Sequence, residues 1–282
     1  MSTAMLARSA KAAQHETCHI VTLTPDLARK WLERNTHNRK PRPGRVEQYA
    51  RDMTAGRWEF NGDAIRFDHN GVMLDGQHRC HAVVKSGVTI RVLVVDNLTP
   101  EAQNTMDRPG VREMRDQLGL AGEYNTGMLA AILRRLVAYT AGSRSIDGGR
   151  VNPTQGEMRE FLDTYPQVRE AVVVSVKAQK YLSCAPSVVG TAYYICAECD
   201  RAAADQFFVT QLIEGIGLTA TSPARALAKR LNDLGSTRGR VNGDDALRYI
   251  FVAWNAYRAG RGLTRLQAPK GGWTAANFPN PR

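Results

Sequence analysis

The hydrophobic pattern of the chain changes near residue 99, and this change limits the folds that the sequence can adopt. Before it, apolar runs of strand length alternate with runs that have the repeat of an amphipathic helix. After it, only the helical repeat remains. This order predicts an α+β protein, in which a small α/β domain precedes a mainly α-helical domain.

The length of 282 residues is enough for two domains. We expect a flexible tail over 1–17, the α/β domain over 18–120, a helical domain over 121–262 and an extended tail over 263–282. The first residues lack the apolar core of a secretory signal, and no apolar run is long enough to span a bilayer. We therefore expect a cytoplasmic protein without a membrane partner, whose five cysteines are reduced.

Local signals place the elements of the α/β domain. Thr-Pro at 24–25 predicts a helix start after a β-branched run. A second helix is expected from about Arg45. Asn-Gly at 70–71 lies between alternating hydrophobic residues and predicts a β-hairpin. A short helix over 77–87 and then a further strand complete the domain.

The second half of the chain reads as a series of helices. Helix-start signals and amphipathic repeats predict helical segments near 99–107, 125–142, 152–166, 186–215, 222–235 and 243–261. The tail is rich in proline and glycine and has no repeat, so we expect it to lie extended over the surface.

The junction between the hairpin and the short helix gathers polar residues that suit a phosphate group. Gly76 lets the backbone approach an anion closely, and the amides that follow it point outward from the helix N-terminus. His78 and Arg79 add donors for phosphate oxygens. Asp75 lies beside that anion, where it would act as a magnesium ligand or as the base that deprotonates a hydroxyl.

Three other interpretations of this junction stay open at the level of sequence. His78 and His81 share a helical face and could bind zinc together with Asp75. Cys80 could act as a nucleophile, although the helical pattern turns it toward the core. The segment could also be an Asp-Gly turn with capping side chains.

The order of several motifs resembles the ParB/sulfiredoxin-like superfamily. The resemblance covers roughly 18–118 and rests on HNRKPRPGRVEQYARDMTAGRW, NGVMLDGQHRCHAVVKSG and IRVLVVDNL. Members share a small α/β domain that binds a nucleotide, with the phosphates at a Gly-x-x-Arg box. The resemblance implies that ATP or CTP binds here with Mg²⁺, in a pocket formed by Asn38, Arg39, Gly76, Gln77, His78 and Arg79.

Some members of the superfamily transfer a phosphoryl group. The free-serine kinases carry an Asp-Gly-x-His-Arg box similar to Asp75–Arg79, which implies catalytic roles for Asp75, His78 and Arg79. Sulfiredoxins have cysteine where this chain has Gln77, so the resemblance does not extend to their chemistry. The helix-turn-helix reader of the partition proteins is also not evident. The chain looks most like the stand-alone members found in phages and bacteria, some of which accompany enzymes that modify DNA bases.

Two further stretches carry candidate nucleotide or metal contacts. Asp107, Arg108 and Arg112 follow the α/β domain and could cover the nucleotide. Their alternative role is that of a charged surface connector. Asp63 lies just before the hairpin and could help Asp75 to hold magnesium.

The basic character of the chain predicts a polyanionic partner. The formal net charge is +11, and residues 201–282 contain 12 Lys and Arg against 5 Asp and Glu. Trp254 and Asn255, with Arg258 and Arg261, could stack on and bind bases, although a core tryptophan is the alternative. DNA is the partner that we expect.

Together these features predict a nucleoside-triphosphate-dependent kinase. Its acceptor would be a hydroxyl, and the one that we expect is that of a 5-hydroxymethyl pyrimidine in DNA. Two alternatives remain, namely a ParB-like DNA-binding NTPase switch and a ParB-like nuclease. The sequence does not assign an oligomeric state.

Overall fold

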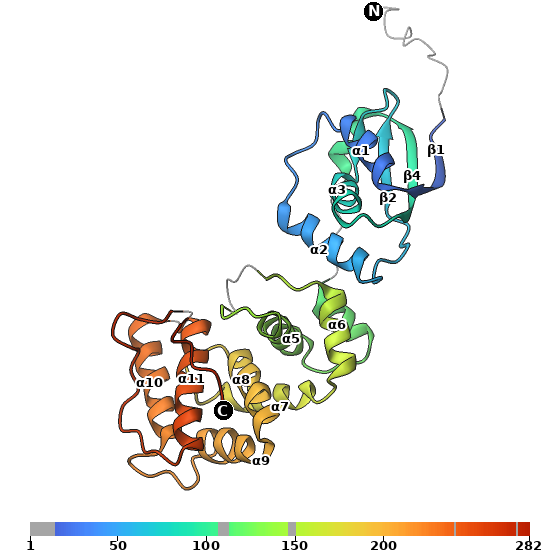
Figure 1. Ribbon diagram of the computed structural model, residues 1–282. Coiled ribbons are helices and arrows are strands. Elements are labelled where there is room, and N and C mark those ends of the chain that lie inside the picture. The colour runs from blue at the N-terminus through green and yellow to red at the C-terminus, as the bar shows by residue number, and fades with distance from the viewer. Residues whose placement is uncertain (1–14, 107–112, 146–150, 240, 275) are drawn as a thin grey trace, which may run out of the picture. The chain divides into compact units, whose positions relative to one another are not determined.

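The computed structural model describes residues 15–106, 113–145, 151–239, 241–274 and 276–282. The chain forms two compact units, Met1–Val111 and Arg112–Arg282. Most of the first predicted tail, 1–14, lies outside the described residues, and the first strand begins at Thr17. The fold is α+β, with one small sheet and a mostly helical remainder (Figure 1).

The sheet of the first unit has four strands in the order β1-β4-β2-β3. These strands are β1 (Thr17–Leu23), β2 (Ala64–Asp68), β3 (Met73–Asp75) and β4 (Ile90–Leu98). β1 pairs with β4 and β2 pairs with β3 in antiparallel fashion, whereas β2 and β4 are parallel. β3 runs back along β2, and α3 then leads the chain into β4 from the end of the sheet at which β2 also starts, so β2 and β4 are parallel.

Helices α1 (Pro25–Glu33), α2 (Pro43–Thr54) and α3 (Gln77–Ser86) build the core of this unit with the sheet. The side chain of Thr24 caps α1 as predicted, because its hydroxyl accepts from the amide of Leu27 at 3.2 Å. α2 begins two residues earlier than predicted, since Pro43 suits the first helical turn. The Asn-Gly hairpin joins β2 to β3 as predicted, and a short 3₁₀ helix (Pro100–Thr105) follows β4.

In the described residues of the second unit, every element of regular secondary structure is a helix. Its elements are α4 (Met114–Leu120), α5 (Thr126–Thr140), α6 (Gln155–Thr164), α7 (Val168–Ala178), α8 (Pro186–Cys199), α9 (Arg201–Ala204), a π-helical segment (Asp205–Ile213), α10 (Pro223–Arg238) and α11 (Gly243–Arg258). One hydrophobic core joins them. No helix among the described residues combines the length and apolarity needed to cross a bilayer.

Three features of the second unit differ from the sequence-based expectation. α4 and α7 were not predicted as helices. The unit begins at Arg112 instead of 121, because α4 packs against α5. The described residues of the tail after 262 form no helix, as predicted, but the tail is anchored, since the side chains of Leu266 and Phe278 are buried in the helical core.

Candidate functional site

The predicted junction is a sharp corner between β3 and α3. Gly76 adopts a left-handed conformation, with φ 108°. A Cβ atom at this position would lie 2.8 Å from Cγ1 of Ile65, so the corner requires glycine. In the described chain no side chain caps the N-terminus of α3, which leaves its first amides, those of Gln77 and His78, free to meet an anion.

Asp75 ends β3 at this corner and is held from two sides. Its Oδ1 accepts from the amide of Gly76 at 2.7 Å. Its Oδ2 accepts from Nη1 of Arg66 at 2.6 Å and lies 3.4 Å from Nη2 of Arg79. The side chain keeps 32% of its surface exposed. The carboxylate is therefore oriented by its partners and still reachable from solvent.

The guanidinium of Arg79 is bound within the protein. Its guanidinium donates to the carbonyl oxygens of Asp63 at 2.5 Å and Ala64 at 2.6 Å, and its side chain is only 11% exposed. These carbonyls lie at the start of β2, so Arg79 ties α3 to that strand. The structure thus favours Arg79 as a positioning residue for Asp75, and it shows no free guanidinium there for a phosphate.

The predicted Asn38 and Gln77 also belong to a structural network. Gln77 is buried, and its amide group donates to the carbonyl of Arg39 at 3.0 Å and accepts from Asn35 at 3.2 Å. Asn38 donates to Asn35 at 2.6 Å and accepts from Gln103 at 2.9 Å. These hydrogen bonds join five residues, namely Asn35, Asn38, Arg39, Gln77 and Gln103. The network fixes the segment before α2 against the start of α3.

His78 connects this segment to the corner. The backbone amide of Arg42 donates to Nε2 of His78 at 3.0 Å. A backbone amide can only donate, so Nε2 is unprotonated and the neutral ring carries its proton on Nδ1. Burial lowers the pKa of His78, and the positive charges of Arg45, Arg39, His81 and Arg42 lower it further. His78 is therefore a neutral donor near pH 7.

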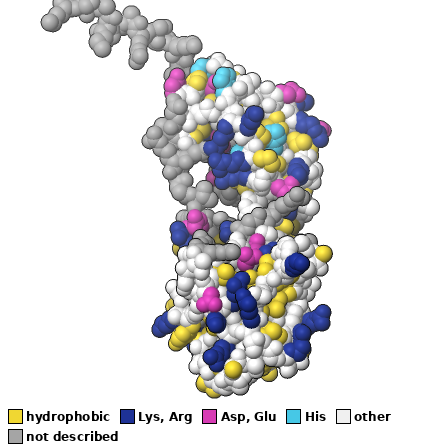
Figure 2. All heavy atoms as spheres, turned by 90° about the vertical axis from the view of Figure 1, so that its left-hand side faces the viewer, with side chains coloured by type: hydrophobic (Ala, Val, Ile, Leu, Met, Phe, Trp, Pro, Cys, Tyr) yellow, Lys and Arg dark blue, Asp and Glu magenta, His cyan; other side chains and the backbone are white. Residues whose placement is uncertain are grey.

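Arg42 and Arg45 are basic residues of this site that the sequence reasoning did not assign. Neither guanidinium has a carboxylate partner in the described part of the chain. Figure 2 shows Lys and Arg side chains gathered beside histidines on one face of the first unit. The run RKPRPGR before α2 was the available signal, because three of its arginines act on His78. The corner therefore combines free helix amides with unpaired positive charge.

The corner does not fit a metal site held by the protein alone. Asp75 is paired with Arg66, and the exposed Asp63 accepts from the side chain of Asn61 at 3.3 Å. Among the described residues, no cluster of three or more His, Cys, Asp or Glu side chains could hold a metal ion. The zinc interpretation with His78 and His81 is thus unsupported.

Cys80 does not act as a nucleophile in this arrangement. The side chain is fully buried, and burial raises the pKa of its thiol to about 12. The thiolate that nucleophilic chemistry requires is therefore scarce near pH 7. The prediction that Cys80 faces the core is confirmed.

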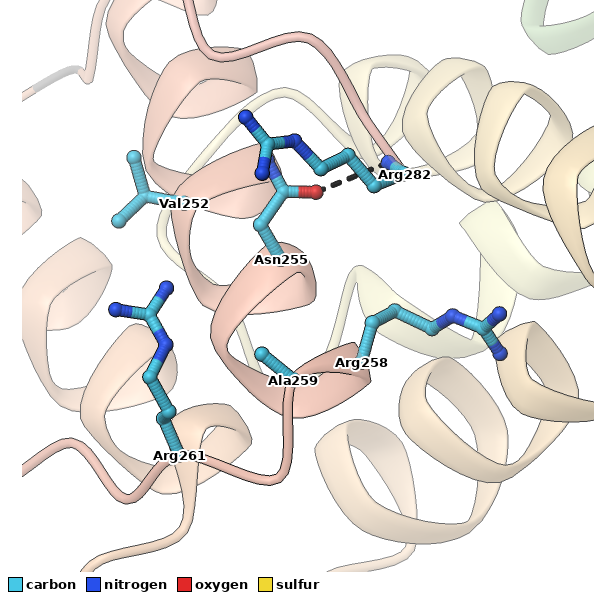
Figure 3. Close-up of a pocket in the computed structure, with 6 residues that line it drawn as sticks. All are labelled: Val252, Asn255, Arg258, Ala259, Arg261 and Arg282. Carbon is cyan, nitrogen blue, oxygen red and sulfur yellow. Dashed lines mark hydrogen bonds between the residues drawn. The ribbon is translucent and has the colours of Figure 1, made fainter.

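The candidate nucleic-acid residues of α11 separate into two groups. Trp254 is fully buried against Phe207 and Phe208, so it does not stack on bases, and the alternative of a core tryptophan is confirmed. Its position on α11 turns the ring into the helical core, where an aromatic side chain buries the most apolar surface. Asn255, Arg258 and Arg261 instead line a pocket on the outer side of the helix, together with Arg282 (Figure 3).

Asp107, Arg108 and Arg112 lie outside the described residues, so their predicted contact with a nucleotide stays a prediction.

Comparison of the chain with protein-family models, curated proteins and solved structures finds no match. The resemblance to the ParB/sulfiredoxin-like superfamily therefore rests on the motifs alone.

Proposed function

We propose that the first unit binds a nucleoside triphosphate, ATP or CTP, at the β3–α3 corner and transfers its terminal phosphoryl group to a hydroxyl. One observation carries the proposal. Arginines without an acidic partner act on His78 at the uncapped start of α3, and an oriented, partly exposed carboxylate, Asp75, immediately precedes that helix. Phosphoryl transfer depends on donors around the phosphates and a positioned base, and these groups supply both.

Each group has a distinct part in this proposal. The amides of Gln77 and His78 and the Nδ1–H of His78 donate to phosphate oxygens. Arg42 and Arg45 neutralise the charge of the triphosphate, and they take the part that the sequence suggested for Arg79. The buried network around Asn38 and Gln77 holds these donors in place.

Asp75 would accept the proton of the attacking hydroxyl. The hydroxyl oxygen forms a bond to the terminal phosphorus, the bond from that phosphorus to the bridging oxygen breaks, and a nucleoside diphosphate leaves. The ion pairs with Arg66 and Arg79 keep the carboxylate oriented toward the corner. The basic chain favours an acceptor in DNA, such as a 5-hydroxymethyl pyrimidine, over a free small hydroxyl compound.

Nucleotide binding is tested first, by calorimetric titration of the full chain with ATP and with CTP. We expect Arg42→Ala and Arg45→Ala each to lower affinity about tenfold, because each removes a charge from the triphosphate site. Lys30→Ala on α1 is the matched control, since it removes one exposed positive charge elsewhere in the unit. Equal losses in the control and the site variants would contradict a defined site.

Transfer is tested with γ-labelled ATP or CTP and with plain or hydroxymethylated DNA. We expect label on the hydroxymethylated DNA, and we expect Asp75→Asn to abolish it while nucleotide affinity stays within a few-fold of wild type. Free labelled phosphate without labelled DNA would point to an NTPase switch, and shortened strands to a nuclease. Either outcome would overturn the kinase assignment.

A further inference from the structure

The second unit carries a basic pocket that is separate from the proposed nucleotide site. It is an open hollow of about 480 Å³ on the outer side of α11, lined by Val252, Asn255, Arg258, Ala259, Arg261 and Arg282. Figure 3 shows the guanidinium groups of Arg261 and Arg282 on the side of Val252, while Arg258 points to the opposite side of the helix.

The backbone of Arg282 is fixed at this pocket by two consecutive residues of α11. Its amide donates to Oδ1 of Asn255 at 3.0 Å, and its carbonyl oxygen accepts from Nε1 of Trp254 at 3.0 Å. Asn255 also donates to the carbonyl of Asn280 at 2.8 Å. Since no side-chain atom of Arg282 takes part in these bonds, its guanidinium is left for another partner.

The three arginines of the pocket differ in their ionic partners. Arg258 forms an ion pair with Asp200, and its guanidinium lies 5.5 Å from the centre of the Trp254 ring. Arg261 and Arg282 have no acidic partner among the described residues. Arg201, another exposed arginine of the unit, pairs with Glu170 and Asp205.

Like charges that share a hollow repel each other and attract an anion. The planar guanidinium groups suit the oxygens of a phosphate, and the amide of Asn255 adds polar character to the wall. The hollow is open, and residues 201–282 have a charge excess of 12 Lys and Arg over 5 Asp and Glu. An open basic surface fits one phosphate of a long polyanion better than an enclosed small anion.

We propose that this pocket binds a backbone phosphate of a nucleic acid, with Arg261 and Arg282 as the two phosphate contacts. Asn255 is a positioning residue, because it holds the backbone of Arg282 at the pocket. With Trp254 buried, the pocket presents no aromatic ring for a base. Binding is therefore independent of base identity. The proposal does not depend on the kinase assignment, since the pocket belongs to the second unit.

Fluorescence anisotropy with a labelled 20-nucleotide DNA strand, measured on the full chain over a range of salt concentrations, tests the proposal. We expect Arg261→Ala and Arg282→Ala each to weaken binding about fivefold to tenfold at low salt and to lower the slope of log Kd against log salt by about one. The control is Arg134→Ala, an exposed arginine on α5 outside the pocket, which we expect to change affinity less than twofold.

Several outcomes would overturn the proposal. One is equal binding by wild type and both pocket variants, and another is a loss as large in Arg134→Ala as in the pocket variants. A requirement for a terminal 5′-phosphate on the strand, or equally tight binding of inorganic phosphate, would also show that the site takes a free monoester. Titration of the same variants with ATP distinguishes a failure of this proposal from a failure of the proposed nucleotide site. A defect in the β3–α3 corner would alter nucleotide affinity and not the DNA salt slope.

Asn255→Ala separates positioning from simple loss of structure. We expect it to weaken DNA binding as much as Arg282→Ala does, and the double variant to be no weaker than either single one, because both act through one guanidinium. Additive losses in the double variant would show that Asn255 does not act through Arg282.

Discussion

The β3–α3 corner and the α11 pocket both gather arginines, but they fix them in different ways. At the corner, the guanidinium groups themselves are bound, since Arg66 donates to Asp75 and Arg79 donates to the carbonyls of Asp63 and Ala64. At the pocket, side chains hold backbone, since Trp254 and Asn255 bind the main chain of Arg282. The corner uses the charges of Arg66 and Arg79 to fix geometry, whereas the pocket fixes Arg282 through its backbone and leaves the guanidinium without an acidic partner.

This difference separates two roles that a basic residue can have. A guanidinium satisfied by carbonyls, as in Arg79, contributes to stability and orientation. A guanidinium without an acid partner, as in Arg45 or Arg261, contributes to anion affinity. Each class should therefore respond to substitution in its own way, and the following predictions use that contrast.

The largest expected effect is on stability at the corner. We expect Gly76→Ala to cost about 3 kcal/mol of unfolding free energy, because it adds backbone strain at φ 108° and a Cβ that overlaps Ile65. Gly87→Ala, at the other end of α3, is the control. It has φ 70° with open space around it, so it should cost about 1 kcal/mol. Urea unfolding with peptide-resolved hydrogen exchange over Met1–Val111 measures both, and equal costs would show that the contact with Ile65 does not matter.

The second-largest effect on stability is expected from substitution of Arg79. We expect Arg79→Ala to destabilise the unit by about 2 to 3 kcal/mol, because the carbonyls of Asp63 and Ala64 lose their charged donor. Arg79→Lys should recover only part of this, since an ammonium cannot reproduce the two-pronged donor geometry. The same unfolding experiment measures both variants. If Arg79→Ala were as stable as wild type but lost nucleotide affinity, the phosphate role suggested by the sequence would be restored.

The sequence predicted the elements around the corner because their signals are local. The Thr-Pro cap, the Asn-Gly hairpin and the glycines at both ends of α3 each act within a few residues. α7 was missed because its run of valines suits a strand by intrinsic preference. Its helix is stabilised by packing of Val168, Ala171 and Val172 in the core, which a local pattern does not show.

The candidate site was predicted only in part, for the same reason. The sequence located the polar residues of Asp75–Arg79, but their roles depend on partners brought in by the fold. Asn38 meets Gln103 from 65 residues away, and Arg282 meets Asn255 from 27 residues away. No periodicity links such positions. Arg282 in particular lies in a segment without a repeat, where side-chain placement follows from tertiary contacts alone.

A smaller loss of stability is expected at the α11 pocket, where the side chain of Asn255 binds the backbone of the C-terminal segment. Asn255→Ala removes two hydrogen bonds to the segment at 280–282, and we expect a local loss of about 1 kcal/mol. Hydrogen exchange of the C-terminal peptide should speed up, while the peptides of α11 stay protected. Arg261→Ala is the control, because it changes the charge of the pocket without touching this segment. Faster exchange in that variant as well would show that charge, and not the Asn255 bonds, retains the segment.

The smallest expected effect is a pH dependence that only the corner should show. The pKa of His78 is lowered in the folded chain, by burial first and then by the nearby positive charges, so the unfolded chain binds more protons. Stability should therefore be complete above about pH 6.5 and fall as the pH drops below that value toward the folded pKa. Protonation would also place a proton on Nε2, which now accepts from Arg42.

His78→Gln should flatten the profile of unfolding free energy against pH between 5 and 7 more than His81→Gln, since burial alone lowers the pKa of His81. If the two variants flatten the profile equally, the arginines around His78 have no measurable effect on its protonation.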